Sequence, residues 1–357
     1  MLLAMQSKER QVCPMFKMPI NVKEMLEAMF SFKKEGKETV NVDVVFDVSA
    51  SDELIEAIYN AFCQAKLVVT SQVKTYILSN GLLELRKDAD LCVLVGGKSL
   101  AMGSVLAQAK DNGTLTVCVV QAGVTTFEEE KKQSIPYSQN VARSVDADKS
   151  TKALNSASNF RTKKQSKDAI VKHTKGIDIN DIVVLDFEDQ EPLESLARWV
   201  ALRMPQKRIA LALQFPFMRR SLCLEITQSN AITNAAVSLV AFIPGADMPI
   251  ITANQAKLVL QIAAIYGNKL DIARAKEIIA VVIGAFGFRS LARNFARFIP
   301  ILGIPIKTAV AYGGTLAVGN AACAYFENDG EKKYDDAINM AVKTGKSVLS
   351  AFIKTRK

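Results

Sequence analysis

The chain has 357 residues, 49% of them hydrophobic and 23% charged, which is enough for about two domains with apolar cores. Its six cysteines form no CxxC pair and His173 is its single histidine, which argues against a disulfide framework and a tetrahedral zinc site. The net charge of +9 suggests an anionic partner, but residues 131–175, with eleven Lys or Arg and three Asp or Glu, hold almost all of it. Residues 1–16 have too short an apolar run to predict a signal peptide.

Residues 1–39 are predicted to form an N-terminal extension with a short helix around Val22 to Phe32. From residue 40 the pattern becomes regular, because apolar runs of strand length alternate with segments of helical spacing. Such runs indicate a mostly parallel sheet that is covered on both faces, so residues 40–204 predict a three-layer α/β domain, Rossmann-like or P-loop-like. The expected strands are 42–48, 66–72, 90–95, 115–121 and 181–187, and the expected helices are 52–65, 82–89, 98–113 and 191–204.

The turn "FDVSASDE" (46–53) follows the first strand, where many α/β proteins carry a phosphate-binding loop. Aligning G-x-x-x-x-G-K-[ST] with it places Phe46 and Ser51 at the two glycines, and Asp52 and Glu53 at the lysine and the hydroxyl residue. These carboxylates would repel phosphate, but they suit the positive end of the following helix. The sequence therefore predicts a well-formed helix start and no nucleotide-binding loop.

Two further segments imitate parts of a nucleotide site. In "GGKS" (96–99), Gly97, Lys98 and Ser99 match the end of a phosphate-binding loop, but its first glycine would fall on Cys92, inside a strand. This segment is either an ordinary turn between a strand and a helix or a site that binds an anion at the start of that helix. "VVQAG" (119–123) lies where a GTPase reads guanine, but Gln121 cannot supply the required carboxylate. No nucleophile, base and acid can be assembled either, so we expect no catalytic residue, cofactor or metal site.

Residues 127–180 are polar, rich in Ser and Lys and poor in large apolar side chains, which predicts a disordered basic insert within the α/β domain. Such a segment is either a solvated insertion or an electrostatic tether for membrane or RNA. Nucleic acid is the weaker alternative, because only Tyr137 and Phe160 could stack on bases there.

Residues 205–357 predict an all-α C-terminal domain that carries little charge over 208–326 and ends in an amphipathic helix. Ile226 to Ala246 and Thr308 to Phe326 are uncharged and reach the ~20 residues that a bilayer core requires. They also contain many small and polar residues, so a tight soluble bundle is the alternative. A strip of small residues recurs every four positions and would allow close helix packing: Ala309, Gly313, Ala317 and Ala321.

The segment "AFGFRSLARNFARFIPILG" (285–303) supplies the candidate membrane contacts. Arg289, Arg293 and Arg297 recur at every fourth position and so share one helical face. A basic face with aromatic neighbours can lie among lipid headgroups, and the alternative is a bundle helix whose arginines meet solvent or acidic partners. The interleaved apolar residues are Phe288, Leu291, Phe295 and Phe298.

Residues 230–327 resemble a known family through three ordered blocks: "NAAVSLVAFIPGADMPIITANQAKLVLQIAAIYG", "RAKEIIAVVIGAFGFRSLAR" and "IPILGIPIKTAVAYGGTLAVGNAACAYFE". They look like domain-of-unknown-function family 697, a helical domain usually found C-terminal to Era-like GTPase domains. The resemblance implies a GTPase-derived scaffold and frequent membrane association, and it brings no assigned catalytic residues. This chain departs from the usual pattern because its α/β half lacks the nucleotide motifs.

These observations together predict a non-catalytic, GTPase-derived scaffold or binding protein of bacterial type. Its expected partner is a membrane lipid surface or a membrane protein, and self-association is compatible with the pattern. The expected location is the cytoplasmic side of a membrane, with the cytoplasm as the alternative. Two other functions are the alternatives: a GTPase-like protein that binds nucleotide through an atypical loop, and a soluble nucleic-acid binder that acts through the basic insert.

Overall fold

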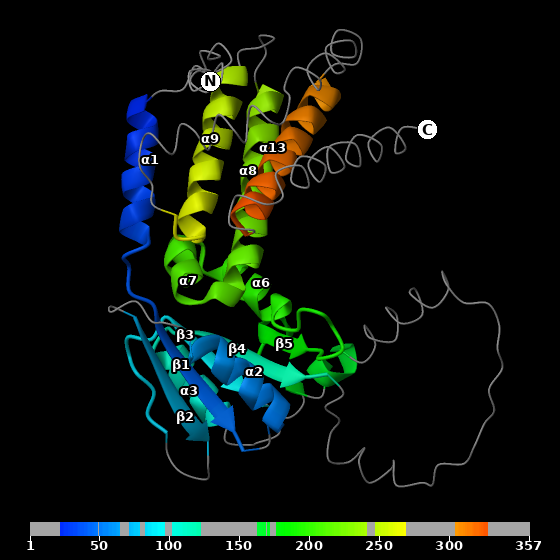
Figure 1. The fold of residues 1–357 in the computed structure, drawn as a ribbon. Coiled ribbons are helices and arrows are strands. Elements are labelled where there is room, and N and C mark those ends of the chain that lie inside the picture. The colour runs from blue at the N-terminus through cyan, green and yellow to red at the C-terminus, as the bar shows by residue number, and fades with distance from the viewer. Residues whose placement is uncertain are drawn as a thin grey trace, which may run out of the picture.

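The computed structural model describes residues 22–48, 50–64, 71–78, 83–96, 102–122, 163–168, 170–171, 176–240, 247–268 and 304–327. These residues form an α/β part and a helical part that stands on it (Figure 1). The predicted fold class is confirmed: an all-parallel sheet with flanking helices is followed by a helical region.

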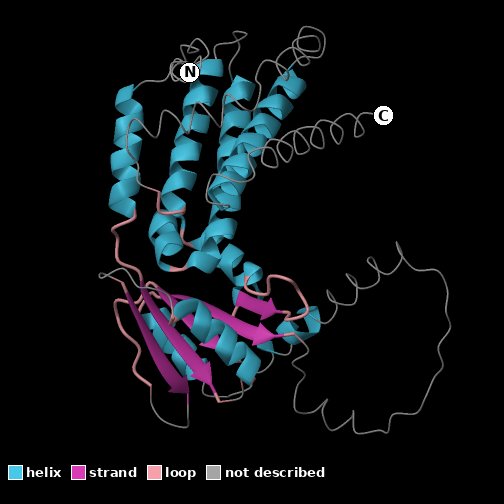
Figure 2. Cartoon of the chain, in the orientation of Figure 1, coloured by secondary structure: helices cyan, strands magenta, loops and turns pink. Residues whose placement is uncertain are grey.

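The sheet contains five parallel strands in the order β2-β1-β3-β4-β5 (Figure 2). This is one of the two common orders of doubly wound α/β sheets. The central strands are buried on both faces, as their continuous apolar sequences predicted. The strands are β1 (Asn41–Asp47), β2 (Gln72–Leu78), β3 (Leu91–Val95), β4 (Leu115–Gln121) and β5 (Ile182–Leu185).

Helices cover both faces of this sheet and make the three layers. On one face, α2 (Asp52–Phe62) and α6 (Glu194–Arg203) share a core with alternate residues of β1, such as Val44. On the other face, α3 (Met102–Asp111) packs in a second core with Val45 of the same strand. The alternation of successive side chains along a strand explains why neighbours in β1 enter different cores.

Three details of the predicted α/β part are wrong. The strand β2 is Gln72–Leu78 and so runs six residues past the expected end at residue 72, whereas residues 66–70 of the expected strand lie outside the described residues. The described part of 82–89 is a loop and not a helix. The predicted disorder of 127–180 fails near its end, because residues 163–168 are helical, the Ser166 and Ile170 side chains are buried, and Lys163 pairs with Asp186 at 3.6 Å.

The helical part is built on three long helices. They are α8 (Arg219–Val240), α9 (Met248–Ile265) and α13 (Ile304–Glu327), and they pack against one another above α7 (Arg208–Gln214). Short 3-10 turns at Pro205–Lys207 and Pro216–Met218 precede α7 and α8.

The described part of the predicted N-terminal extension, from Val22 onward, packs on this helical part. Its predicted helix is present as α1 (Val22–Glu35), which lies along α9 in Figure 1. Lys257 of α9 pairs with Glu24 of α1 at 3.3 Å, and the Glu35 carboxylate accepts a hydrogen bond from the Ile209 backbone N–H at 2.8 Å. The described helical part is therefore assembled from α1, which precedes the sheet in the sequence, and from the helices that follow the sheet.

Candidate functional site

The candidate site of the α/β part is the crevice beyond the carboxyl ends of β1 and β3. The chain leaves β1 toward β2 on one side of the sheet, and leaves β3 toward β4 on the other side. In open α/β sheets, ligands bind in the crevice that such a change of direction creates. Asp47, Val95 and Gln121 end the three strands that meet at this crevice.

The end of β3 approaches the end of β1 very closely. Gly96 has a φ of +119°, and a Cβ atom placed on it would lie 2.7 Å from the Cβ of Asp47. The Gly96 N–H donates to the Val119 carbonyl of β4 at 2.9 Å, which holds the turn in this position. Only glycine satisfies both the backbone angle and the contact.

The start of α2 is built as its sequence predicted. Ser51 is the N-cap, with its hydroxyl accepting a hydrogen bond from the Leu54 N–H at 3.3 Å. Asp52 and Glu53 occupy the first turn, where their charges meet the positive end of the helix. The turn therefore caps a helix where a nucleotide enzyme would place a lysine and a hydroxyl residue.

Gln121 closes the crevice from the other side. Its side-chain amide N–H donates to the Glu53 carboxylate at 3.0 Å, and its amide oxygen accepts a hydrogen bond from the Ser51 hydroxyl. These contacts join the end of β4 to the start of α2, across the mouth of the crevice. The sequence identified Gln121 only as a residue that cannot read guanine, so its bridging role was missed.

The electrostatics of the crevice are acidic. Asp47 is buried, whereas the Asp52 and Glu53 side chains are exposed beside it. Burial and the nearby Asp47 charge raise the pKa of the Cys118 thiol to about 12, so this cysteine is protonated and is no nucleophile at neutral pH. Among the residues that the structure describes, no group of three or more His, Cys, Asp or Glu is placed to hold a metal ion.

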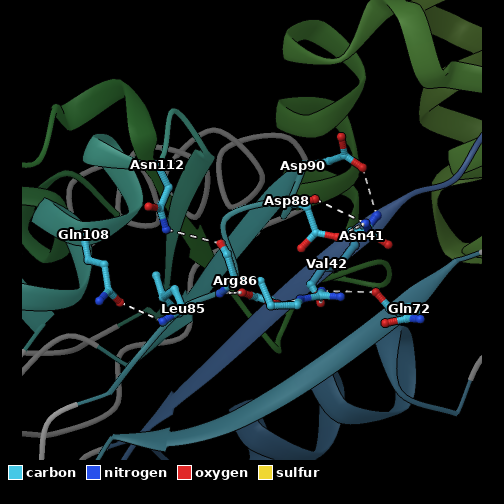
Figure 3. Close-up of polar contacts among 10 residues, drawn as sticks. Asn41, Val42, Gln72, Leu85, Arg86, Asp88, Asp90, Gln108 and Asn112 are labelled. Carbon is cyan, nitrogen blue, oxygen red and sulfur yellow. Dashed lines mark hydrogen bonds and ion pairs between the residues drawn. The ribbon is translucent and has the colours of Figure 1, made fainter.

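A structural polar network lies at the amino ends of β1 and β3, at the end of the sheet opposite the crevice (Figure 3). The Arg86 side chain donates to the fully buried Asp43 carboxylate at 2.7 Å and to the Val42 carbonyl at 2.9 Å. Asn41 donates its backbone N–H to Asp90 at 2.9 Å. These contacts hold the loop before β3 against the strands.

The helical part contains a second polar cluster, buried between its three long helices. Asn234 of α8 donates to the Thr315 hydroxyl of α13 at 3.0 Å, and Gln255 of α9 donates to the same hydroxyl at 3.2 Å. Asn254 of α9 donates to the Asn234 amide oxygen at 2.8 Å. Asn234, Gln255 and Thr315 are all buried, so hydrogen bonds, and not apolar contacts alone, fix the register of these helices.

The burial pattern of α8 is reversed in its distal half, the half far from the sheet. There Asn234 and Ser238 are buried, whereas Ile232, Leu239 and Val240 are exposed. We call these side chains and their neighbours at the start of α9 the tip surface, which lies at the end of the bundle farthest from the sheet (Figure 1). Its residues and exposed fractions are Ile232 56%, Leu239 54%, Val240 67%, Met248 48% and Ile250 51%.

The structure describes some of the residues that were predicted to contact a membrane, and others lie outside the described part of the chain. Arg289, Arg293 and Arg297 lie outside the described residues, as do Gly97, Lys98, Ser99 and His173. Of the predicted small-residue strip, Gly313, Ala317 and Ala321 are buried in α13, as close packing requires, whereas Ala309 is partly exposed. By length and composition, α9 is the described helix that could cross a membrane, and more than half of that stretch is buried in the bundle. The expected uncharged span Thr308 to Phe326, in α13, does not meet that test, and the span Ile226 to Ala246 runs from α8 into residues outside the described ranges.

The comparisons with known proteins assign the chain to no family. A scan of the chain against models of protein families finds no match, and a search of curated proteins finds no similar sequence. The likeness of residues 230–327 to family 697 therefore stays a prediction.

Proposed function

We propose that this chain is a membrane-associated, non-catalytic binding or scaffolding protein, which contacts lipid through its helical part and presents its α/β part on the cytoplasmic side. The observation that carries this proposal is the reversed burial of the distal half of α8, with the Asn234 amide and the Ser238 hydroxyl inside and large apolar side chains outside. A helix on a soluble bundle normally has the opposite arrangement. In lipid, apolar side chains face the acyl chains, and polar side chains hydrogen-bond between helices.

The distribution of charge supports the same role. Residues 226–246 contain no charged side chain, and neither do residues 308–326. At the distal end, Asp247 is buried and pairs with Lys307 at 3.1 Å, so the two charges there compensate each other. Paired charges are the form in which ionisable groups are tolerated near a bilayer. Arg289, Arg293 and Arg297 are proposed to add contacts with anionic headgroups.

The crevice of the α/β part supports a binding role without catalysis. Gln121, Ser51 and Glu53 bridge its mouth, and the carboxylates of Asp47 and Asp52 give it the wrong sign for phosphate. This part is therefore proposed to act through its surface, with no bound nucleotide. A saturable, Mg²⁺-dependent signal from a fluorescent GTP analogue at micromolar concentration would contradict this half of the proposal.

The test is flotation of the full chain with anionic vesicles, using variants matched for residue type and exposure. L239D/V240D changes the tip surface, where the two side chains are 54% and 67% exposed. L202D/V48D is the control on the α/β part, where the corresponding side chains are 52% and 70% exposed. Because a buried aspartate costs about 3 kcal/mol in a bilayer, the tip variant should bind at least about a hundred-fold more weakly.

We expect the control variant to float as the unmodified chain does. A carbonate wash of cell membranes then separates two forms of association: a peripheral protein is released, and a spanning protein is retained. Equal flotation of both variants, or no flotation of the unmodified chain with any lipid composition, would show that the tip surface does not contact lipid.

A further inference from the structure

The outer edge of β2 is the feature that carries an inference beyond membrane association. β2 pairs with β1 over seven residues, from Asn41↔Gln72 to Asp47↔Leu78, and it is the first strand in the sheet order. Within the described ranges, no strand pairs with its other side, and Figures 1 and 2 show it at the margin of the sheet. A seven-residue edge presents a row of backbone N–H and C=O groups to which another strand can bind.

The side chains of this edge include one charge, Lys74, of the kind that protects natural edge strands, and all the others are uncharged. Thr75 and Ile77 are exposed, and Ile77 reaches 72%. Lys74 is the single charged residue of the strand, and β2 contains no proline. Exposed apolar residues on a long edge strand are typical of a pairing surface.

We propose that β2 pairs with β2 of a second copy of this chain, antiparallel and about a two-fold axis at Thr75. Thr75 is the middle residue of the strand, so this register engages all seven residues of each copy. A two-fold contact uses the same edge on both partners and closes after two copies. The result is a continuous ten-stranded sheet in which neither β2 is an edge.

The sequence of β2 is complementary to itself in this register. Ile77 of each copy lies opposite Val73 of the other, which makes two apolar cross-strand pairs on one face. On the other face, Lys74 lies opposite Tyr76, so the lysine stem can pack on an aromatic ring. Moving the axis to Lys74 would shorten the overlap and place the two lysines directly opposite each other, which is unfavourable. Charge and length therefore select the same register.

This assignment does not depend on the proposed membrane role, because β2 lies in the α/β part, on the far side of the molecule from the tip surface (Figure 1). The test uses the full chain in a mild detergent, with its mass measured by light scattering over a range of concentrations. The unmodified chain should shift from monomer to dimer as concentration rises.

Two variants that place opposite charges at Thr75, on the two-fold axis, test the interface directly. T75K places two lysines against each other and T75E two glutamates, so each variant alone should be monomeric at concentrations where the unmodified chain is dimeric. An equimolar mixture of T75K and T75E should regain the dimer, because the mixed pair brings opposite charges together. Rescue by mixing separates a lost interface from a lost fold, since two misfolded chains would not restore each other.

A further variant covers the case in which both Thr75 variants unfold. I77K changes a side chain that is already largely exposed, and it should weaken the dimer at least ten-fold while leaving the thermal unfolding midpoint unchanged. The proposal is overturned if the unmodified chain is monomeric at all concentrations. It is also overturned if the dimer survives T75K, T75E and I77K, or if the mixture of folded T75K and T75E stays monomeric.

Discussion

At the scale of single residues, the α/β part depends on polar groups that lie inside apolar sequence. Asp43 is in the middle of β1 and fully buried, and the Arg86 side chain that pairs with it is only 8% exposed. Removing one member of such a pair leaves a buried charge without its partner, which is far more costly than losing a surface ion pair. The sequence shows the acid within "VDVVFDV", but it does not show a partner 43 positions away.

Gly96→Ala should destabilise the chain by about 2 kcal/mol or more. The glycine has a positive φ, and the new Cβ would meet the Asp47 side chain at 2.7 Å, so both backbone strain and overlap oppose the substitution. Gly103→Ala is the matched control, because a methyl group added there, in α3, would meet nothing within 4 Å, and alanine favours a helix. Urea unfolding midpoints measure both. A Gly96→Ala variant as stable as Gly103→Ala would show that the β3 turn is free of strain.

Only those residues of the candidate crevice that are adjacent in the sequence could be predicted. Ser51, Asp52 and Glu53 are adjacent in the sequence, and together they form a recognisable helix start. Gln121 is about 70 residues away, and it reaches Ser51 and Glu53 because β4 and β1 end at the same edge of a parallel sheet. Its role therefore required the strand order, which the sequence does not specify.

At the scale of secondary-structure elements, the buried strands were predictable and the edge strand was not. β1, β3 and β4 are buried on both faces, so their sequences are mostly apolar, with β3 apolar throughout. β2 has exposed positions throughout, and "QVKTYIL" gives a weaker signal than the apolar run just before it. The prediction followed the stronger run and ended the strand at residue 72, where β2 begins. Helices α8, α9 and α13 were foreseen as a helical region, but their buried amides resemble solvent-facing residues in sequence.

The pair formed by α8 and α13 gives a prediction at this scale. A Cβ placed on Gly319 of α13 would lie 2.3 Å from the Thr227 side chain of α8, so the two helices are in direct contact there. Gly319→Ala should force them apart and destabilise the bundle by roughly 1–3 kcal/mol, as overpacking does. Gly314→Ala, in the same helix, is the control, because its nearest neighbour is the Gln255 amide nitrogen at 4.0 Å.

Thermal unfolding in detergent followed by circular dichroism should show a lower midpoint for Gly319→Ala, and an unchanged or higher midpoint for Gly314→Ala. Equal midpoints would indicate that α8 and α13 can separate without cost. The same comparison tests whether the buried Asn234–Thr315 hydrogen bond needs this close approach, since separation of the helices would also lengthen it.

At the scale of the whole molecule, the sheet and the helices are parts of one structure. A single apolar cluster runs from β1 and α2 through α6 and α7 into α8, α9 and α13. Phe62 of α2 contacts the rings of Phe215 and Phe217, at centroid distances of 5.0 and 5.3 Å, between α7 and α8. Lys207 adds polar contacts across the same junction, to Asp90 at 2.7 Å and to the Thr39 carbonyl at 2.8 Å. The composition suggested two domains, whereas this shared core couples them.

We therefore expect the α/β part and the helical part to unfold together. The single tryptophan, Trp199, reports on the α/β side through its hydrogen bond to the Asn180 carbonyl, whereas far-ultraviolet circular dichroism is dominated by the long helices. Both signals should change at the same denaturant concentration. Phe62→Ala removes a fully buried ring at the junction and should lower both midpoints together, at a cost of about 3–5 kcal/mol. If Trp199 fluorescence moved to lower denaturant while the helical signal stayed in place, the two parts would be independent domains and the junction only a contact between them.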